Sequence, residues 1–371
     1  MRPSTPPASN APLVWYVTPH GYGHAARSCT IIRALVERHP EIPVLLCSTH
    51  PESFLHNRLP PSVRIRPVAL DRGLVMHDSI RIDFDASLKA LAELAEGHAE
   101  RVRAEADFLA RAGARLVAAD IPPAALEAAA MAGVRAVGLG NFSWGWIYRH
   151  YERADPRWRP FADAARRGCA RADLLLRYPA HEPMSDFPRI VDTPVPAAVG
   201  RTRREEMAAR YGLDPNRRWV LMSFQTLDLP EVALRSMSDA KDIEWISVRP
   251  LEWEDRRGFT AVDRAEFPFA DVLASSDLVL TKPGHGILCE CLASRKPMVC
   301  VERPDWPEND VLMDAIRRYL PHDSLRASDF LRGLAPAAVE AVAHGPAAPE
   351  PPPPADPGQI AEMLVEQWTA G

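Results

Sequence analysis

Long apolar segments are missing from this sequence of 371 residues. A membrane span needs about 20 consecutive apolar residues. The most suggestive uncharged stretch, 136–148, is shorter and carries Gly, Asn and Ser. The first residues also lack the apolar core of a secretory signal. We therefore expect a cytoplasmic protein with no transmembrane segment.

Cysteine is scarce and irregularly spaced. The six cysteines form no CxxC pair. The CxxC spacing is frequent in zinc and redox sites. Cys289 and Cys291 lie two residues apart, so on a helix their side chains point to different sides. No group of His, Cys and carboxylate residues has a convincing metal-ligand spacing. We expect reduced, buried thiols, no metal site and no cofactor.

A strongly basic composition is also absent. The 44 Lys and Arg residues against 49 Asp and Glu give a net charge of −5, which argues against a nucleic-acid partner. Lysine is rare, and one group of arginines could attract an acidic acceptor or a membrane surface. Because charge runs usually mark a solvated face, peripheral membrane contact is the minor hypothesis. These arginines are Arg157, Arg159, Arg166, Arg167 and Arg171.

What is present is a repeated alternation of short apolar runs with helical patterns. The length suffices for about two domains of roughly 150 residues each. Strands alternating with helices predict parallel sheets, whose ligands bind at the carboxyl ends of the strands. The expected strands are 13–18, 43–48, 63–68, 116–119 and 134–139, then 218–224, 243–248, 277–281 and 297–301. The expected helices are 25–38, 86–111, 122–133 and 286–293.

Proline-rich segments mark the predicted boundaries. Residues 1–12 are expected to be a disordered tail and 346–357 a linker. Between them lie two Rossmann-like domains, 13–195 and 201–345, joined by a hinge within 192–200. The final segment, 358–371, is predicted to form a helix that packs back toward the first domain.

A glycine-rich turn with two histidines joins the first strand to the first helix. It runs from Thr18 to Arg27 and contains His20, Gly21, Gly23 and His24. Glycine lets the backbone approach a ligand closely, and helix amides favour anions. The turn is neither GxGxxG nor a P-loop. It predicts titratable nitrogens at the rim of the sheet, against the alternative of an ordinary turn with solvated histidines.

Two further turns carry polar residues at strand ends. Asp120 can accept a hydrogen bond from the His24 imidazole and orient it as a base; equally, it can cap the helix that follows. In the later turn from Lys282 to Glu290, Lys282 and the helix amides suit a diphosphate. Glu290 suits paired sugar hydroxyls, although the bland alternative is a glutamate stabilised by the helix dipole.

Together these segments resemble GT-B glycosyltransferases. The late turn is similar to the donor motif of the bacterial peptidoglycan GlcNAc transferases, whose glycine and ribose-binding glutamate would fall on Gly284 and Glu290. In plant-type sugar transferases, a GH histidine is the general base and an aspartate orients it. Those roles would fall on His24 and Asp120, with His20 as a possible aid.

Most of the chain is more similar still to the N-terminal half of L-arabinokinases and their bacterial stand-alone relatives. The resemblance does not include the sugar-kinase half of arabinokinases, so it does not imply kinase activity. The matching stretches are 16–27, 70–73 with Asp78 and Asp83, 141–144 with 147–148, and 282–290.

The resemblance implies an α/β GT-B fold, with an acceptor domain and a nucleotide-sugar domain facing across a cleft. It implies metal-independent transfer of a hexosyl or N-acetylhexosaminyl group from a nucleoside-diphosphate sugar, expected to be UDP-linked, to an acceptor hydroxyl. The implied donor-binding residues are Gln225, Phe269, Lys282, Gly284, His285, Gly286, Glu290, Glu308 and Asn309. The implied acceptor-binding residues are Tyr22, Asn141, Phe142 and Trp144.

Two other functions stay open at this point. An epimerase or hydrolase could use the same fold and would consume a nucleotide sugar without an acceptor. A non-catalytic nucleotide-sugar-binding protein would give no product. The loop 223–226 lacks the glycine that many relatives place near the diphosphate, and this departure favours the non-catalytic alternative.

Overall fold

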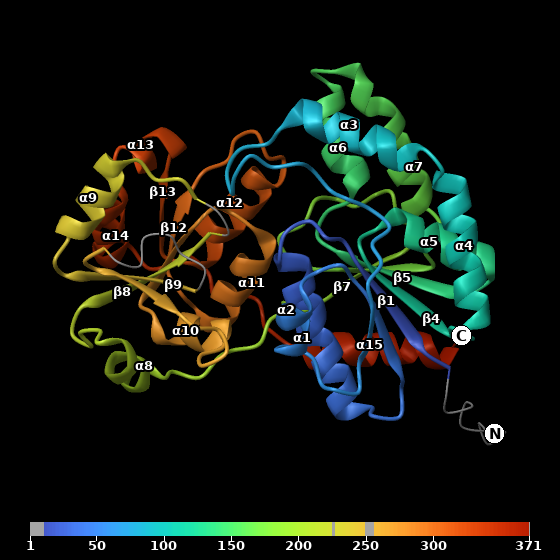
Figure 1. Cartoon of the computed structure of the whole chain (residues 1–371), viewed down its shortest axis with the longest axis horizontal. Coiled ribbons are helices and arrows are strands. Elements are labelled where there is room, and N and C mark those ends of the chain that lie inside the picture. The colour runs from blue at the N-terminus through green and yellow to red at the C-terminus, as the bar shows by residue number, and fades with distance from the viewer. Residues whose placement is uncertain (1–10, 225–226, 249–255, 371) are drawn as a thin grey trace. The chain divides into compact units, whose positions relative to one another are not determined.

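The chain forms two compact units in a computed structural model that describes residues 11–224, 227–248 and 256–370 (Figure 1). Unit 1 holds the chain up to Val75, then Asp83–Ala197 and the segment from Asp356 onward. Unit 2 holds Ala198–Ala355 and the short segment Met76–Ile82. Each unit is built around its own parallel sheet.

The sheet of unit 1 has seven parallel strands in the order β3-β2-β1-β4-β5-β6-β7. Its first six positions have the order of doubly wound nucleotide-binding sheets. Central strands such as β1 are apolar and buried throughout, because helices cover both faces of the sheet. The strands are β1 (Leu13–Val17), β2 (Val44–Cys47), β3 (Arg64–Arg66), β4 (Leu116–Asp120), β5 (Arg135–Gly140), β6 (Leu174–Arg177) and β7 (Ile190–Asp192).

Alternate residues of β1 belong to different cores, as the two-residue period of a strand requires. Leu13, Trp15 and Val17 pack with α1 (Gly23–Arg38) and α15 (Pro357–Ala370), which lie side by side (Figure 1). Val14 and Tyr16 pack with α4 (His98–Arg111) and α5 (Pro123–Ala132) on the other face. The last helix, predicted to pack toward the first half, therefore completes the core of unit 1.

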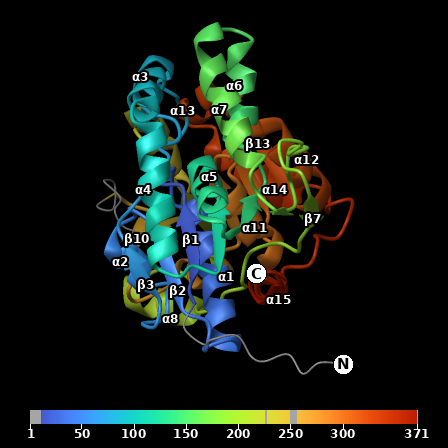
Figure 2. The same ribbon diagram turned by 90° about the vertical axis from the view of Figure 1, so that its right-hand side faces the viewer.

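Helices α6 and α7 pack against each other beyond the sheet (Figure 2). Of the five arginines that could attract a membrane surface, Arg157, Arg159 and Arg166 lie in or next to these helices. Each forms an ion pair with a neighbouring carboxylate, which offsets its positive charge. No helix in the described ranges is long and apolar enough to cross a membrane. The remaining elements of this unit are α2 (Glu52–His56), α3 (Phe84–Ala95), α6 (Trp144–Glu152), the 3-10 helix Pro156–Trp158 and α7 (Arg159–Cys169).

Unit 2 has a second parallel sheet of six strands, ordered β10-β9-β8-β11-β12-β13. This is again the doubly wound order. The strands are β8 (Arg218–Ser223), β9 (Ile243–Val248), β10 (Phe259–Val262), β11 (Leu278–Thr281), β12 (Met298–Val301) and β13 (His322–Leu325). The helices are α8 (Arg204–Tyr211), α9 (Glu231–Asp239), α10 (Phe269–Ser275), α11 (His285–Ser294), α12 (Glu308–Tyr319), α13 (Ala327–Leu331) and α14 (Ala335–His344).

The structure differs from the sequence expectations in several places, including the following. The single helix expected at 86–111 is two helices, because Glu96 is extended and Gly97 adopts a left-handed φ of 68° between them. Strands β6, β7, β10 and β13 were not anticipated. Residues 76–82 were expected inside the first domain but belong to unit 2. The reason is that they contact segments of unit 2, which are distant in the sequence.

Candidate active site

The glycine-rich turn of unit 1 follows the carboxyl end of β1 and leads into α1. Gly21 has a φ of 66°, a left-handed conformation that favours glycine. His50 Nε2 lies 2.8 Å from the Gly21 carbonyl oxygen and donates a hydrogen bond to it. The His50 ring also contacts Tyr22, whose ring packs on Phe54. The turn is therefore held from β2 and α2 as well as from its own helix.

His24, on the first turn of α1, contacts Asp120 at the end of β4. Their Nδ1 and Oδ1 atoms are 2.8 Å apart, and the two side chains are almost completely buried. Strands β1 and β4 are paired, with Val17 opposite Asp120, so both residues lie at the carboxyl edge of the sheet. The structure thus brings together the imidazole and the carboxylate that the sequence predicted to interact.

A third buried side chain, Arg27, joins this pair. Its Nε donates to Asp120 Oδ2 at 2.7 Å and its NH2 to Asp120 Oδ1 at 2.5 Å. Its NH1 donates to Asn141 Oδ1 at 3.0 Å. Ser28 Oγ also donates to Asp120 Oδ2, at 3.0 Å. The Asp120 carboxylate is therefore held by Arg27 and Ser28 in addition to His24.

These contacts fix the charge of Asp120. Burial alone would raise its pKa, but the Arg27 charge and the hydrogen bonds from Arg27 and His24 hold the pKa of this carboxyl well below its ordinary value. Arg27 NH2 also lies 2.8 Å from His24 Nδ1. Only one arrangement makes Nε2 a base: Nδ1 must carry a proton and donate it to Asp120, rather than accept one from Arg27.

His20 lies on the same turn, against Trp144 and Gly73. Its ring is edge-on to the Trp144 indole, with centroids 5.4 Å apart. Gly73 has a φ of 67°, and a Cβ there would come within 2.6 Å of His20 Cβ. The close approach of the two segments therefore requires glycine at position 73.

Trp144 and the buried carboxyl of Asp71 form a pair that the sequence did not assign. Trp144 Nε1 donates to Asp71 Oδ2 at 2.8 Å. The other oxygen, Asp71 Oδ1, lies near the hydroxyl of neighbouring Thr18, but within the described residues neither atom makes a hydrogen bond of good geometry. Burial, with a smaller contribution from the Asp120 charge, raises the pKa of Asp71 to about 7.

The predicted acceptor-binding residues lie around this cluster, and most are buried. Asn141, Phe142 and Trp144 are each at most 2% exposed. One face of the Trp144 indole is stacked on Tyr148, with centroids 5.6 Å apart, and Phe142 packs edge-on against it and against His24. In this structure these rings support His20 and His24, whereas Tyr22 is only partly buried.

The second glycine turn lies at the carboxyl end of β11 in unit 2. Thr281 Oγ1 donates to the Ser223 carbonyl oxygen at 2.7 Å, which joins the ends of β11 and β8. Lys282 Nζ lies 3.2 Å from the position that a Cβ on Gly284 would occupy, so the ammonium lies over the turn. Burial and the neighbouring Arg303 charge lower the pKa of Lys282 to about 7, while Glu308 opposes the change.

The loop after β12 lies beside this turn, because β11 and β12 are paired. Glu308 accepts a hydrogen bond from Trp306 Nε1 at 2.8 Å. Asn309 Oδ1 accepts one from the Arg303 backbone N–H at 2.9 Å. Both predicted donor residues are thus buried and engaged in ordering the loop.

The other predicted donor residues are distributed over α10 and α11. Phe269 is the first residue of α10 and is partly buried. His285 and Gly286 open α11, with His285 buried against Cys289, and Glu290 lies on the next turn of the helix. Gln225 lies outside the described residues.

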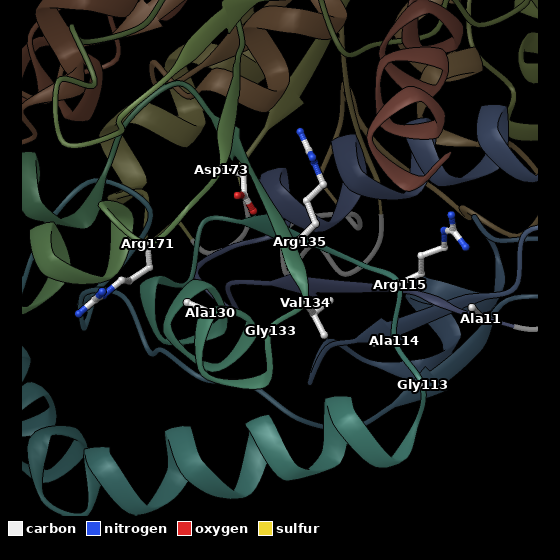
Figure 3. A pocket seen from close by; sticks show the side chains of 10 residues that line it. All are labelled: Ala11, Gly113, Ala114, Arg115, Ala130, Gly133, Val134, Arg135, Arg171 and Asp173. Carbon is white, nitrogen blue, oxygen red and sulfur yellow. The ribbon is translucent and has the colours of Figure 1, made fainter. Parts of the chain in front are cut away.

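A separate hollow of about 650 Å³ lies at the opposite, amino-terminal edge of the unit 1 sheet (Figure 3). Arg115 and Arg135 line it, but both donate hydrogen bonds to the end of α15. None of the predicted site residues lines it. No group of three His, Cys, Asp or Glu side chains in the described ranges is arranged to hold a metal ion.

Sequence reasoning missed Arg27, Asp71 and Arg303. Arg27 had a usable signal, because it lies three residues after His24 on a helix and therefore on the same face. Asp71 lies in 70–73, one of the stretches that resemble L-arabinokinases, but its burial depends on segments far away in the sequence. The same holds for the burial of Arg303, which had no such signal.

Comparison with known proteins yields no matching family model. The L-arabinokinase of Arabidopsis thaliana is 28% identical over 340 residues, which cover 88% of this chain. The chain spans about a third, 32%, of the length of that curated relative.

Solved structures of glycosyltransferases match nearly the whole chain at low identity. The kitacinnamycin glycotransferase has a TM-score of 0.59 and 17% identity, covering 96% of this chain and 94% of its own. The calicheamicin glycosyltransferase CalG4 has a TM-score of 0.60 and 14% identity, covering 97% and 95%. UGT2 of Phytolacca americana, solved with UDP-2fluoro-glucose and pterostilbene, has a TM-score of 0.61 and 15% identity, covering 97% and 94%.

Proposed function

Because this chain has the two-domain GT-B fold of these glycosyltransferases, we propose that it transfers a sugar from a nucleoside-diphosphate sugar to an acceptor hydroxyl. The proposed donor is a UDP-linked hexose or N-acetylhexosamine, a class supported by the UDP-sugar analogue bound to one structural neighbour. The proposal also includes a reaction that needs no metal ion.

The His24–Asp120 pair is the observation that carries this proposal. Asp120 is ionised and fixed by Arg27, so it can orient the imidazole and stabilise its protonated form. His24 Nε2 takes the proton of the acceptor hydroxyl while that oxygen forms a bond to the anomeric carbon of the donor. The bond from this carbon to the diphosphate oxygen breaks, and the nucleoside diphosphate leaves with the electron pair.

The donor side of the proposal rests on the turn of unit 2. Lys282 and the backbone amides of Gly284, His285 and Gly286 would offset the charge that grows on the departing diphosphate. Glu290, one turn into α11, would hold the ribose hydroxyls.

The test compares His24→Ala with His56→Ala, a control histidine exposed on α2. We expect loss of sugar transfer in the first variant, with UDP affinity nearly unchanged, and ordinary activity in the second. Glu290→Ala should mainly weaken UDP binding, as measured by calorimetry. Turnover by His24→Ala equal to that of the unmodified protein would contradict the assignment of the base.

Arg27 favours a second candidate, a non-catalytic nucleotide-sugar-binding protein. If Arg27 NH2 donates to His24 Nδ1 across their 2.8 Å separation, the imidazole proton lies on Nε2 and the base is lost. Such a protein would bind UDP but form no product with any acceptor. Consumption of a UDP-sugar without an acceptor would instead identify a hydrolase or an epimerase.

A further inference from the structure

A short hairpin, residues 76–82, carries sequence from the first half of the chain into unit 2. Met76 and Ile82 form an antiparallel bridge. Asp78 Oδ1 accepts hydrogen bonds at 2.8 Å from the backbone N–H groups of both Ile80 and Arg81, which closes the tip. The Ile80 side chain packs against the apolar core of unit 2. The hairpin is therefore a structured part of the unit that contains the proposed donor turn.

The hairpin reaches one particular side chain, the buried guanidinium of Arg303. Arg303 Nε donates to the Ile80 carbonyl oxygen at 3.3 Å. The guanidinium also lies 4.6 Å from the centre of the Trp306 ring. Because Arg303 is only 5% exposed, these contacts hold its guanidinium group in place.

Lys282 and Arg303 follow the ends of two adjacent strands, because Thr281 pairs with Cys300 across β11 and β12. The Arg303 charge lowers the pKa of the Lys282 ammonium, and the Glu308 carboxylate opposes this change. Within the described residues, Lys282 Nζ has no hydrogen bond or ion pair. Two cations are therefore held near each other at adjacent strand ends, where like charges destabilise the empty site. A ligand with two adjacent negative groups would relieve this repulsion, and a diphosphate has that charge pattern.

We propose that Arg303 binds the diphosphate of the donor together with Lys282, and that hairpin 76–82 positions Arg303 for this role. The inference rests on the proposed function and adds to it a second cation and a positioning segment. It also means that the proposed donor site in unit 2 is incomplete without hairpin 76–82. This hairpin precedes Ala198, where the main part of unit 2 begins, by more than a hundred residues.

The experiment measures UDP and uridine affinities by calorimetry for the unmodified protein and five variants. Uridine carries the base and ribose without phosphate, so it reports on the rest of the site. Arg303→Gln should weaken UDP binding by about tenfold or more, as expected for a charge-assisted hydrogen bond, and leave uridine binding unchanged. Arg303→Lys, which keeps the charge, should recover part of the loss. Arg317→Gln on the exposed part of α12 is the control.

The hairpin is tested by Asp78→Ala, which removes the acceptor that closes its tip. We expect weaker UDP binding with unchanged uridine binding. Arg81→Ala is the matched control, because the Arg81 side chain is 71% exposed and its removal leaves both backbone hydrogen bonds to Asp78. It should bind UDP like the unmodified protein.

Three results would overturn the inference. Equal UDP affinity in Arg303→Gln and the unmodified protein would remove Arg303 from the diphosphate site. A weakened Arg303→Gln with an unaffected Asp78→Ala would refute the positioning role of the hairpin. If the unmodified protein binds neither UDP nor UDP-sugars, the proposed function itself fails, and this outcome is distinguishable because it does not depend on any substitution.

Discussion

Replacing Asp71 with Asn should stabilise this protein at neutral and alkaline pH. Asp71 is 7% exposed, and one of its carboxylate oxygens makes no hydrogen bond of good geometry in the part of the chain that the structure describes. Its pKa rises from 3.8 to about 7. One pKa unit corresponds to about 1.4 kcal/mol, so ionised Asp71 destabilises the folded state by ~4 kcal/mol relative to the unfolded chain.

The direction of the pH dependence follows from the pH at which Asp71 releases its proton in the folded protein and in the unfolded chain. Below about pH 4 both states are protonated, and Asp71 contributes no penalty. Between about pH 4 and 7 the unfolded chain loses the proton while the folded protein keeps it, so stability falls as pH rises. Above about pH 7 both states are ionised, and the penalty is complete.

An asparagine at position 71 cannot ionise and retains an oxygen that can accept from Trp144. Its amide group can also donate toward the Thr18 hydroxyl, which makes no hydrogen bond of good geometry within the described residues. We therefore expect Asp71→Asn to be more stable than the unmodified protein by about 2–4 kcal/mol at pH 8, and within about 1 kcal/mol of it at pH 4.5.

Urea unfolding followed by far-UV circular dichroism at several pH values measures this difference. Asp107→Asn, which removes an exposed carboxylate from α4, controls for the loss of one charge. The reasoning would be refuted by a stability difference between Asp71→Asn and the unmodified protein that stays constant from about pH 4 to 8, or that favours aspartate as pH rises.

Three further predictions concern single side chains. UDP-glucose should bind about tenfold more weakly at pH 8 than at pH 6, because Lys282 loses its proton near pH 7. In calorimetry, the Lys282→Met variant should bind UDP-glucose weakly at both pH values. Asp120→Ala should lower the free energy of unfolding by about 3–5 kcal/mol, since it leaves the Arg27 charge buried without its partner, and an unchanged urea midpoint would contradict this. Gly73→Ala should destabilise the protein by about 1–3 kcal/mol and displace His20, because the new Cβ adds a steric overlap at a left-handed φ. A crystal structure of the variant with His20 unmoved would disprove the displacement.

Local sequence patterns were sufficient to predict the strand ends that carry the proposed site. An apolar run, a glycine and a helical pattern follow one another within a dozen residues at both turns, and this order predicted the positions of His24 and Lys282. Asp120 was also predicted, because parallel strands present their carboxyl ends at one edge. The single helix expected at 86–111 was wrong, since Gly97 in a left-handed conformation interrupts a continuous apolar pattern.

The sequence by itself therefore determined the alternation of strands and helices and the residues at the strand ends, because both depend on neighbours a few positions away. Only the tertiary structure decided which charges share a buried site. Arg27 neutralises Asp120, and among the described residues one Asp71 oxygen makes no hydrogen bond of good geometry. Arg303 contacts Ile80 in a hairpin more than two hundred residues earlier in the chain. Burial and ion pairing at these positions arise from the packing of distant segments, which local sequence patterns do not encode.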